Sequence, residues 1–512
     1  MSETPSKPPR PAIPVSLYVL VTVVTAERVV LRAGLRGKAL LWIVAGSAIV
    51  CLVAAVALRK GGLGGATPTL FAAWVALVAG AGLAGIAYAE GTSLETALES
   101  RSVSSFEFEV TGEMSEGRDG WRGRALARGE GIPEGLVWIL TDEEVQEGTA
   151  IDCVGRYAPD AEDEWGISSR MQGVWGTVRV MRILSSEPRS GILGALDVWR
   201  GLVLQSFDTG RSEARAVLAG CVCGSRSAIR SDGLDDVFAA CGLSHLVAVS
   251  GGHLVVLCAI VGVLLERMRM RPSTRSLLLL AICGAFVLFC GAPASAVRAW
   301  AMFGVASGAS AAGRRAHALS SVCAVACAMA LWEPTLSGEL GFLLSVLSVV
   351  GICLFSGYGR YAAGCLPQVR RVPRWVPRGA SRGFYQVRDD LRDVIVVSLA
   401  AQLVTLPLTA SAFSRVSLVA PLANVVAAPL FMLVMGIGAV ATCLVPVPAV
   451  QGVALACADV VGGAFVWAMR TLAALPLASI PVEVGAAPAL AVATVAAVAL
   501  LVAWPDVRGG LL

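Results

Sequence analysis

The chain has 512 residues, of which 56% are hydrophobic and 15% charged, and its formal net charge at pH 7 is +4. Soluble domains usually carry about a quarter charged residues, so the composition excludes an ordinary soluble protein, and the mean hydropathy of +0.72 agrees. Each run of about 20 apolar residues can span a bilayer. We therefore expect a polytopic α-helical membrane protein.

Residues 1–90 contain the first expected membrane spans. Two long apolar runs, residues 39–58 and 68–89, are strong spans, and a shorter run over residues 13–26 is a candidate third. Three spans place the N-terminus in the cytoplasm and leave the basic residues between Arg28 and Lys38 outside, whereas two spans place the N-terminus outside. Both counts stay open, with three favoured.

Residues 91–190 have a different character. They contain 19 acidic residues against 10 arginines, and short alternating segments are separated by glycine, proline and acidic turns. Such alternation predicts β-strands, here over residues 106–110, 122–127, 136–140, 150–155 and 176–183. Five strands favour a small OB-like β-barrel inserted in the membrane protein, although the spacing also suits other small β folds.

The remaining residues divide into two regions. Residues 191–242 combine helical patterning with charges on one side, which predicts amphipathic helices in the membrane interface. Residues 243–512 are expected to form the main membrane domain. Its expected spans are residues 243–265, 277–297, 299–312, 316–332, 335–357, 394–413, 418–445, 449–472 and 486–504. With the N-terminal spans, this gives about 11 or 12 crossings.

Clusters of arginine orient these spans. One cluster follows residue 265, a second precedes residue 316, and a third fills residues 358–393. Basic loops stay in the cytoplasm. Placing all three clusters there puts residues 91–190 on the extracytoplasmic side of the membrane.

Polar residues inside spans are costly and are therefore candidates for function. The densest group consists of Ser244, His245, Ser250, Gly251, Gly252 and His253. The Ser-Gly-Gly sequence is expected to break the span and to expose backbone carbonyls to a cavity. Further candidates are Arg298, Glu339, Gln402 and Asn424. Arg298 suits a phosphate contact, or it snorkels to the membrane interface.

Two other interpretations of this group stay open. Ser250 and His253 lie three residues apart on one helix face, so they could form the dyad of an intramembrane serine hydrolase, although no carboxylate that would orient the histidine is evident. Polar packing between helices is the simpler alternative. With only three histidines and no clustered ligands, we expect no metal site and no cofactor.

The expected barrel combines arginine with tryptophan. Arginine can contact phosphates while tryptophan stacks on bases, which is how single-stranded nucleic acid is held. The candidates for this role are Trp121, Arg122, Arg124, Trp138, Trp175 and Arg179. The alternative is that the aromatic residues are simply the barrel core.

The sequence resembles the ComEC family of competence proteins. The family's most specific signature, Gly-x-Ser-His-Leu-x-Ala-x-Ser-Gly-x-His, is matched over residues 242–253, with Gly252 where the family usually has leucine. A second block is matched by Arg298, Ala299, Pro334, Gly341, Phe342, Leu344 and Ser345, with Leu343 in place of a common glutamine. A third block is matched by Gln402, Pro407, Phe413, Asn424 and Pro429.

The resemblance implies a channel that carries single-stranded DNA across the bacterial inner membrane during natural transformation, with residues 91–190 as the family's OB-like domain. It also implies a periplasmic-side DNA receptor, a separate nuclease and a cytoplasmic ATPase motor as partners of a protein that is not itself an enzyme. Many family members carry a metallo-β-lactamase-like domain; no His-x-His-x-Asp cluster occurs here, so we expect a variant without it. A secondary transporter of a small solute is a further alternative, but no inverted repeat is visible.

Overall fold

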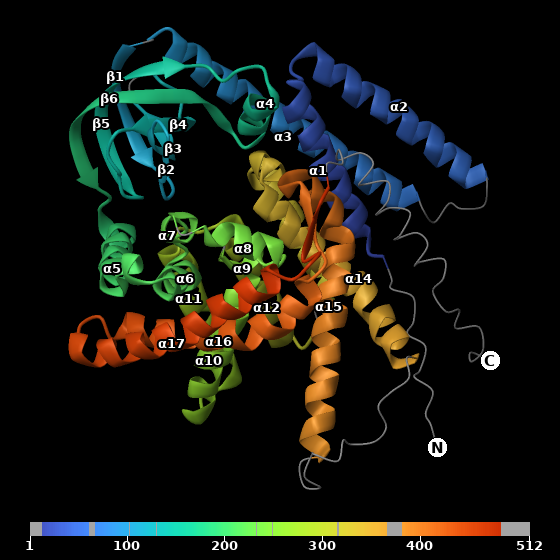
Figure 1. Ribbon diagram of the computed structural model, residues 1–512. Coiled ribbons are helices and arrows are strands. Elements are labelled where there is room, and N and C mark those ends of the chain that lie inside the picture. Colours follow the sequence, from blue (N-terminus) through green and yellow to red (C-terminus); the bar gives the residue numbers. More distant parts are fainter. Residues whose placement is uncertain are drawn as a thin grey trace.

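The computed structural model describes residues 13–60, 67–101, 103–129, 131–231, 233–247, 249–314, 317–365 and 381–482. The expected span 486–504 and part of the basic stretch 358–393 lie outside these residues. Figure 1 shows three parts, which are the N-terminal helices, a β-barrel and a larger helical part.

Three helices precede the barrel: α1 (Val15–Ala33), α2 (Lys38–Lys60) and α3 (Thr67–Glu99). The two strong expected spans correspond to α2 and α3, and the candidate third span is the first part of α1. α3 continues beyond the expected end of its span and places Leu94 and Leu98 in the barrel core. Only residues 100–102 separate α3 from β1, so the barrel is attached directly to the end of α3.

The insert is a closed five-stranded β-barrel, which confirms the predicted fold class. Its strands are β1 (Val103–Val110), β2 (Ser115–Gly117), β3 (Gly120–Arg128), β4 (Gly135–Thr141), β5 (Thr149–Ala158) and β6 (Val174–Pro188). The order β1-β5-β6-β4-β3 closes because β1 also pairs with β3, and β2 extends the edge of β3. The pairs are antiparallel except β4 with β6, which is parallel. Helix α4 (Glu164–Met171) lies between β5 and β6.

Alternating residues of these strands fill the barrel. Phe108, Ile139 and Ile151 are completely buried, as expected for strands whose inward face is apolar. Cys153, the single thiol of the insert, lies in the same core, and burial raises its pKa to about 12. This thiol is thus neither accessible nor ionised at neutral pH.

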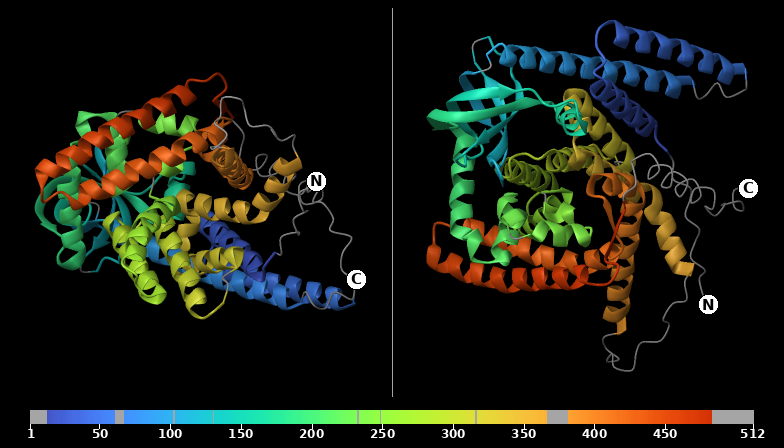
Figure 2. Two further views of the ribbon diagram at one scale, coloured as in Figure 1. Left: turned by 90° about the horizontal axis from the view of Figure 1, so that it is seen from below. Right: turned by 45° about the horizontal axis from the view of Figure 1, so that its top comes forward.

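The helical part follows the barrel. Its elements are α5 (Gly191–Phe207), η2 (Thr209–Arg211), α6 (Glu213–Cys223), α7 (Ser227–Ser231), α8 (Leu234–Ala240), α9 (Ser244–Val247), α10 (Gly251–Arg267), α11 (Pro272–Phe289), α12 (Ala294–Ala311), α13 (Ala318–Trp332), η3 (Pro334–Gly338), α14 (Leu340–Cys365), α15 (Ser381–Phe413), β7 (Arg415–Ser417), α16 (Ala420–Cys443), α17 (Pro448–Ala473) and β8 (Ser479–Pro481). Figure 2 shows α5 running from the barrel toward the pair α16 and α17.

Seven helices in the described part of the chain are long and apolar enough to cross a membrane. They are α2, α3, α11, α14, α15, α16 and α17. α13 is apolar but has only 15 residues, and α10 has 17. The chain is a multi-pass membrane protein, and the expected total of 11 or 12 crossings stays a prediction.

Helix α6 belongs to residues 191–242, which were expected to form amphipathic helices in the membrane interface. It does not lie at such an interface. Every residue of α6 after Glu213 is buried, and the helix packs against α16 and α17. Its many small residues allow close packing on all sides, and its arginine is neutralised because Arg215 pairs with Asp459 of α17. α6 is thus a core helix. α5, in contrast, exposes Ile192 and Val198.

The junction of α3 with the barrel makes a sharp prediction. A Cβ atom at Gly91 would lie 1.8 Å from the ring of Trp175, whereas a Cβ at Gly82 of the same helix would meet nothing within 4 Å. Gly91→Ala must displace a buried ring and should destabilise the protein by about 1–3 kcal/mol. Gly82→Ala should be neutral or slightly stabilising. Thermal unfolding of the purified variants, followed by tryptophan fluorescence, measures both; equal melting temperatures would contradict the close packing at this junction.

Candidate functional site

The signature over residues 242–253 lies at the start of α10. Ser250 is the residue before the helix, and its backbone N–H donates to Nδ1 of His253 at 3.1 Å. The Ser250 hydroxyl lies 3.3 Å from the same nitrogen. A side chain in the first turn that bonds back to the preceding N–H satisfies a donor that the helix itself leaves free. The Ser-Gly-Gly sequence therefore lies at the start of α10, and the preceding helix α9 ends at Val247, so the expected span 243–265 is interrupted at this point.

This geometry does not support the hydrolase interpretation. Because Nδ1 of His253 accepts a backbone N–H, a neutral ring carries its proton on Nε2. Nε2 is buried without a hydrogen-bond partner among the described residues, so no carboxylate orients the ring as a base requires. The ring instead meets Phe431 of α16 edge-on, at 4.8 Å between centroids.

Helix α12 brings Arg298 beside this signature. The Ser295 hydroxyl donates to the carbonyl of Val249 at 2.8 Å, and a Cβ at Gly251 would lie 3.3 Å from the Cβ of Ala299. Two blocks that are about 50 residues apart in sequence thus pack against each other. The structure brings them together as neighbours on α10 and α12.

Arg298 is 2% exposed, so it does not snorkel to an interface. Its guanidinium donates to the hydroxyl of Ser345 on α14 and, at 3.1 Å, to the sulfur of Met302. Its Nε has no partner, and within the described part of the chain no carboxylate pairs with it. A buried cation without a counter-charge is costly, which sets Arg298 apart from the other buried arginines.

The other predicted residues of the membrane part lie apart from Arg298. Asn424 of α16 donates to the hydroxyl of Ser398 on α15 at 2.9 Å, an interhelical hydrogen bond of the expected kind. Gln402 is half-buried on α15, and Ser244 and His245 lie on the short helix α9. In the described part of the chain no group of three His, Cys, Asp or Glu could hold a metal ion.

Glu339 connects the helical part to the barrel. Its carboxylate pairs with Arg124 of β3 at 3.1 Å. The preceding turn η3 touches the barrel as well, because Thr335 lies against Gly173 and Gly338 lies against the carbonyl of Met171. The sequence analysis placed Arg124 and Glu339 in separate sites, and the structure joins them.

Arginines form a row across the outer face of the barrel. In register, Arg122 of β3 faces Leu140 of β4, Leu140 faces Arg179 of β6, and Arg179 faces Arg156 of β5. Like charges directly opposite each other are unfavourable. An anion bound along this face would relieve that repulsion.

Two tryptophans cover the Arg122 end of this row. The guanidinium of Arg122 lies 4.6 Å from the ring of Trp138 and 4.4 Å from that of Trp165. Burial lowers the pKa of Arg122, and the carboxylate of Asp160 opposes that shift. Trp165 was not predicted as part of this face, because it follows the acidic residues 160–164, near the start of α4, outside any expected strand.

Two of the predicted DNA contacts are not available on this face. Trp175 is 4% exposed and lies in the barrel core, where its ring meets Tyr88 of α3 edge-on. Trp121 is half-buried against the same core. Trp175 and Trp121 thus belong to the barrel core and its edge, whereas Trp138 lies on the outer face beside Arg122.

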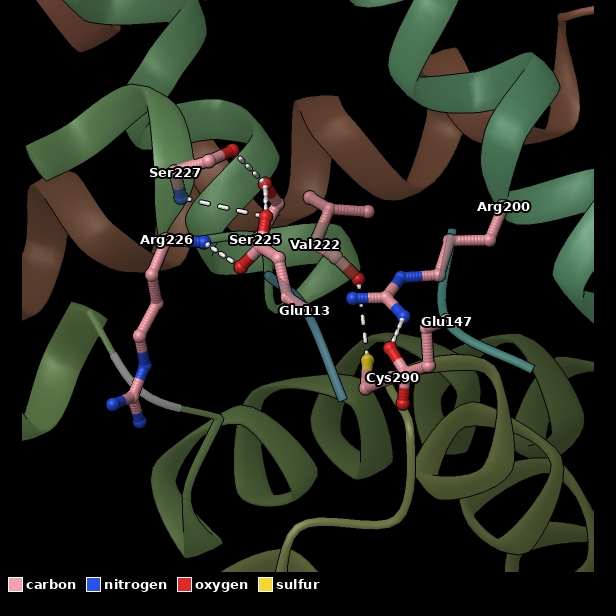
Figure 3. A network of polar contacts seen from close by, with 8 residues as sticks. All are labelled: Glu113, Glu147, Arg200, Val222, Ser225, Arg226, Ser227 and Cys290. Atoms are coloured by element: carbon pink, nitrogen blue, oxygen red, sulfur yellow. Dashed lines mark hydrogen bonds and ion pairs between the residues drawn. The ribbon is translucent and has the colours of Figure 1, made fainter. Parts of the chain in front are cut away.

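Two carboxylates hold the barrel on the helical part (Figure 3). Glu113 accepts hydrogen bonds from the hydroxyl of Ser225 and the backbone N–H of Arg226, both at 2.6 Å. Glu147 pairs with Arg200 of α5. Burial lowers the pKa of Arg200, but Glu147 raises it more, so the net shift is upward.

Further arginines lie around this junction. Burial lowers the pKa of Arg226, and the neighbouring cations of Arg230 and Arg124 lower it further, whereas Asp235 and Glu113 oppose the shift. Arg230 itself lies 3.6 Å from Asp235. Arg226 therefore lies near cations of both parts, Arg230 of α7 and Arg124 of β3.

These features define a multi-pass membrane protein with a β-barrel docked on its helices. A family model described as "Competence protein" matches residues 221–507, more than half of the chain, and the chain belongs to this family. "ComE operon protein 3" of Bacillus subtilis (strain 168) is 28% identical over 200 residues, covering 39% of this chain and 23% of that protein.

"Competence protein ComA" of Neisseria gonorrhoeae is 26% identical over 282 residues, covering 52% of this chain and 36% of that protein. The chain thus matches only a quarter to a third of the length of these relatives. No solved structure matches the chain.

The docking contact predicts an asymmetric mutational effect. Glu147→Gln removes the counter-charge of Arg200, whose side chain is only 10% exposed, and should destabilise the protein by about 3 kcal/mol. The double variant Glu147→Gln/Arg200→Met should recover most of that loss, because no buried charge remains. Glu266→Gln, which removes an exposed pair with Arg275, should cost about 0–1 kcal/mol. Thermal unfolding in detergent compares them; a double variant as unstable as the single one would contradict this account.

Proposed function

We propose that this protein is a channel that carries single-stranded DNA across the inner membrane of a bacterium during natural transformation. Membership of the competence family supports this proposal. The observation that carries it is Arg298, a buried guanidinium that no described carboxylate neutralises, next to the family's signature motif.

A single strand carries one negative charge per nucleotide, so it needs a polar path through the membrane. Arg298 donates to a hydroxyl and a thioether and keeps Nε free. Guanidinium groups bind phosphate oxygens through several N–H donors at once. A phosphate of the passing strand would supply the negative charge that no described carboxylate provides to Arg298.

The barrel face would receive the strand before it enters the helices. Arg122, Trp138 and Trp165 combine a cation with stacking surfaces, and such combinations hold single strands without sequence preference. Arg179 extends the cationic row. The overall acidic charge of the barrel argues against tight binding of duplex DNA, since that binding depends on phosphate neutralisation.

The proposal requires other proteins. The sequence contains no Gly-x4-Gly-Lys-Ser/Thr loop for ATP, so a cytoplasmic ATPase motor or strand-binding proteins would supply the energy. A periplasmic-side receptor would deliver the DNA, and a separate nuclease would produce the single strand.

We favour an orientation with three N-terminal crossings, in which α1, which is not among the seven helices that are long and apolar enough to cross alone, crosses packed against α3. The basic end of α1 lies beside the barrel, where Arg32 pairs with Glu164 of α4 and Arg36 donates to Thr92 near the end of α3. α1 therefore runs toward the barrel, α2 away from it and α3 back to it (Figure 1). The arginines that the three-span model leaves outside have partners on that side.

The first test concerns Arg298. Labelled single-stranded oligonucleotide should accumulate in proteoliposomes of the purified protein that enclose a single-strand-binding protein as a trap. Arg298→Gln should reduce the rate about tenfold or more, because a charge-assisted hydrogen bond contributes about 1.5–3 kcal/mol, and Arg298→Lys should keep part of it. Arg275→Gln, at an exposed pair, is the matched control. Equal rates for Arg298→Gln and the control would refute the channel role of Arg298.

The second test concerns orientation. Cys153 is buried, so it cannot report on the exposure of the barrel, and a cysteine must be introduced at an exposed position such as Glu107. A membrane-impermeant maleimide should label Glu107→Cys in intact cells whose outer wall has been made permeable. Peptide mass spectrometry separates this label from background on the native thiols. Labelling that needs prior lysis of the membrane would place the barrel in the cytoplasm.

A further inference from the structure

Glu27 is a completely buried carboxyl group in the middle of α1. It is 0% exposed, and neither of its oxygens has a hydrogen-bond partner among the described residues. The hydroxyl of Ser337 lies near enough to favour the ionised form, but it donates its proton to the carbonyl of Pro334 at 2.8 Å. The sequence analysis gave it no role, because it lies one residue beyond the candidate span 13–26. Its neighbours on α1 show tight packing: a Cβ at Gly80 of α3 would lie 3.1 Å from the carbonyl of Val23.

Within the described part of the chain no cation pairs with this carboxyl. The adjacent Arg28 directs its guanidinium to the carbonyl of Ser337, at 2.6 Å, and Arg32 is engaged by Glu164. Glu333, the residue before η3, also acts on Glu27 and is itself acidic. On α13 the titratable neighbour is Cys327, and α3 presents small residues here, such as Ala81 and Ala84.

An ionised carboxylate in such a place is far less stable than the protonated acid. A second acidic group nearby disfavours ionisation further. The geometry thus fits a carboxyl group that holds a proton at neutral pH, and the bound ligand of this site is the proton itself.

The site is connected to the barrel by a short path of contacts. Glu27 lies beside Ser337 of η3, and Arg28 bonds to the same residue. The next residue, Gly338, lies against the carbonyl of Met171 in α4, and Glu339 pairs with Arg124 in β3. An ionised Glu27 would need water or a cation beside its carboxylate. The turn η3 would have to move to admit either.

We propose that Glu27 is a proton-binding site whose occupancy controls how firmly η3 holds the barrel. With the proton bound, α1, η3 and the barrel form the packed arrangement described above. Loss of the proton loosens η3 and with it the Glu339–Arg124 contact. This inference does not depend on the DNA-channel proposal, because it concerns the state of one carboxyl group.

The direct test uses the unaltered protein. Dicyclohexylcarbodiimide, an apolar reagent, adds to protonated carboxyl groups in apolar surroundings and leaves a stable N-acylurea. Peptide mass spectrometry should find the adduct on Glu27 at neutral pH, decreasing as the pH becomes alkaline. The exposed Glu333 is the internal control and should react only under acidic conditions. A Glu27 that stays unmodified, or that reacts only when Glu333 does, overturns the proposal; so does suppression by sodium ions at constant pH, which indicates a metal-ion site.

A second test measures the linkage to stability. In the unfolded chain Glu27 ionises at about pH 4.3, whereas in the folded protein it keeps its proton. Above that pH the unfolded state therefore binds fewer protons than the folded state, so the free energy of unfolding falls as the pH rises. Glu27→Gln has nearly the same shape and no proton to lose. Its apparent melting temperature in detergent should exceed that of the natural protein at pH 8 and should decline less with pH.

Proteolysis completes this test. Limited digestion at the junction of the barrel should increase at alkaline pH in the natural protein and not in Glu27→Gln. Glu90→Gln, at an exposed position of α3, is the matched control, and it should behave like the natural protein in both measurements. Identical melting curves for Glu27→Gln and Glu90→Gln would overturn the proposal, whatever the result of the DNA assays.

Discussion

Charged and polar side chains that lie among apolar helices need partners within the protein, because neither lipid nor packed side chains can replace water. Most such groups in this chain obey that constraint. Arg215 pairs with Asp459, Gln451 donates to Ser206, and Asn424 donates to Ser398. Each pair joins two helices, and in the first two pairs the partners are 244 and 245 residues apart in sequence. The contacts that satisfy buried groups therefore also determine how the helices pack.

Several buried polar atoms in the described part of the chain depart from this pattern, among them the hydroxyl of Ser16 and the indole N–H of Trp74. Three of the residues concerned matter for the proposals made above: Arg298 through Nε, Glu27 through both oxygens and His253 through Nε2. Arg298 and His253 lie on either side of the contact between α12 and α10, and Glu27 lies beside the turn that holds the barrel. A cation that lacks a counter-charge suits an anionic substrate, whereas an acid that lacks a cation suits a proton.

Three carboxylates hold the barrel on the helical part, each through a different contact. Glu147 neutralises a buried arginine, Glu113 accepts hydrogen bonds at the start of α7, and Glu339 pairs with Arg124. The barrel insert is rich in acidic residues, and part of that acidity serves docking. On the outer face of the barrel, Arg124 and Arg128 pair with carboxylates, whereas Arg122, Arg156 and Arg179 form no ion pair within the described residues and could meet an anion.

Helices and strands could be predicted from the sequence, whereas most contacts between side chains could not. Alternation located all five barrel strands, and apolar runs located the long helices, since both patterns are local. Burial of α6 could not be foreseen, because its charges resemble an amphipathic pattern until Arg215 meets Asp459. The inward position of Trp175 and the pairing of Arg124 with Glu339 depend on strand register and docking, which no local pattern encodes.

The departure of this chain from the family signature at Gly252 has a simple physical basis. A Cβ at Gly252 would meet only the hydroxyl of Ser250, at 3.6 Å, which is an ordinary contact, whereas a Cβ at Gly251 would lie 3.3 Å from Ala299. The space at position 252 is therefore open to a larger side chain such as leucine, while position 251 faces α12. The neighbouring glycines differ in what they do: Gly251 keeps α10 close to α12 and to Arg298, and Gly252 can vary without disturbing that contact.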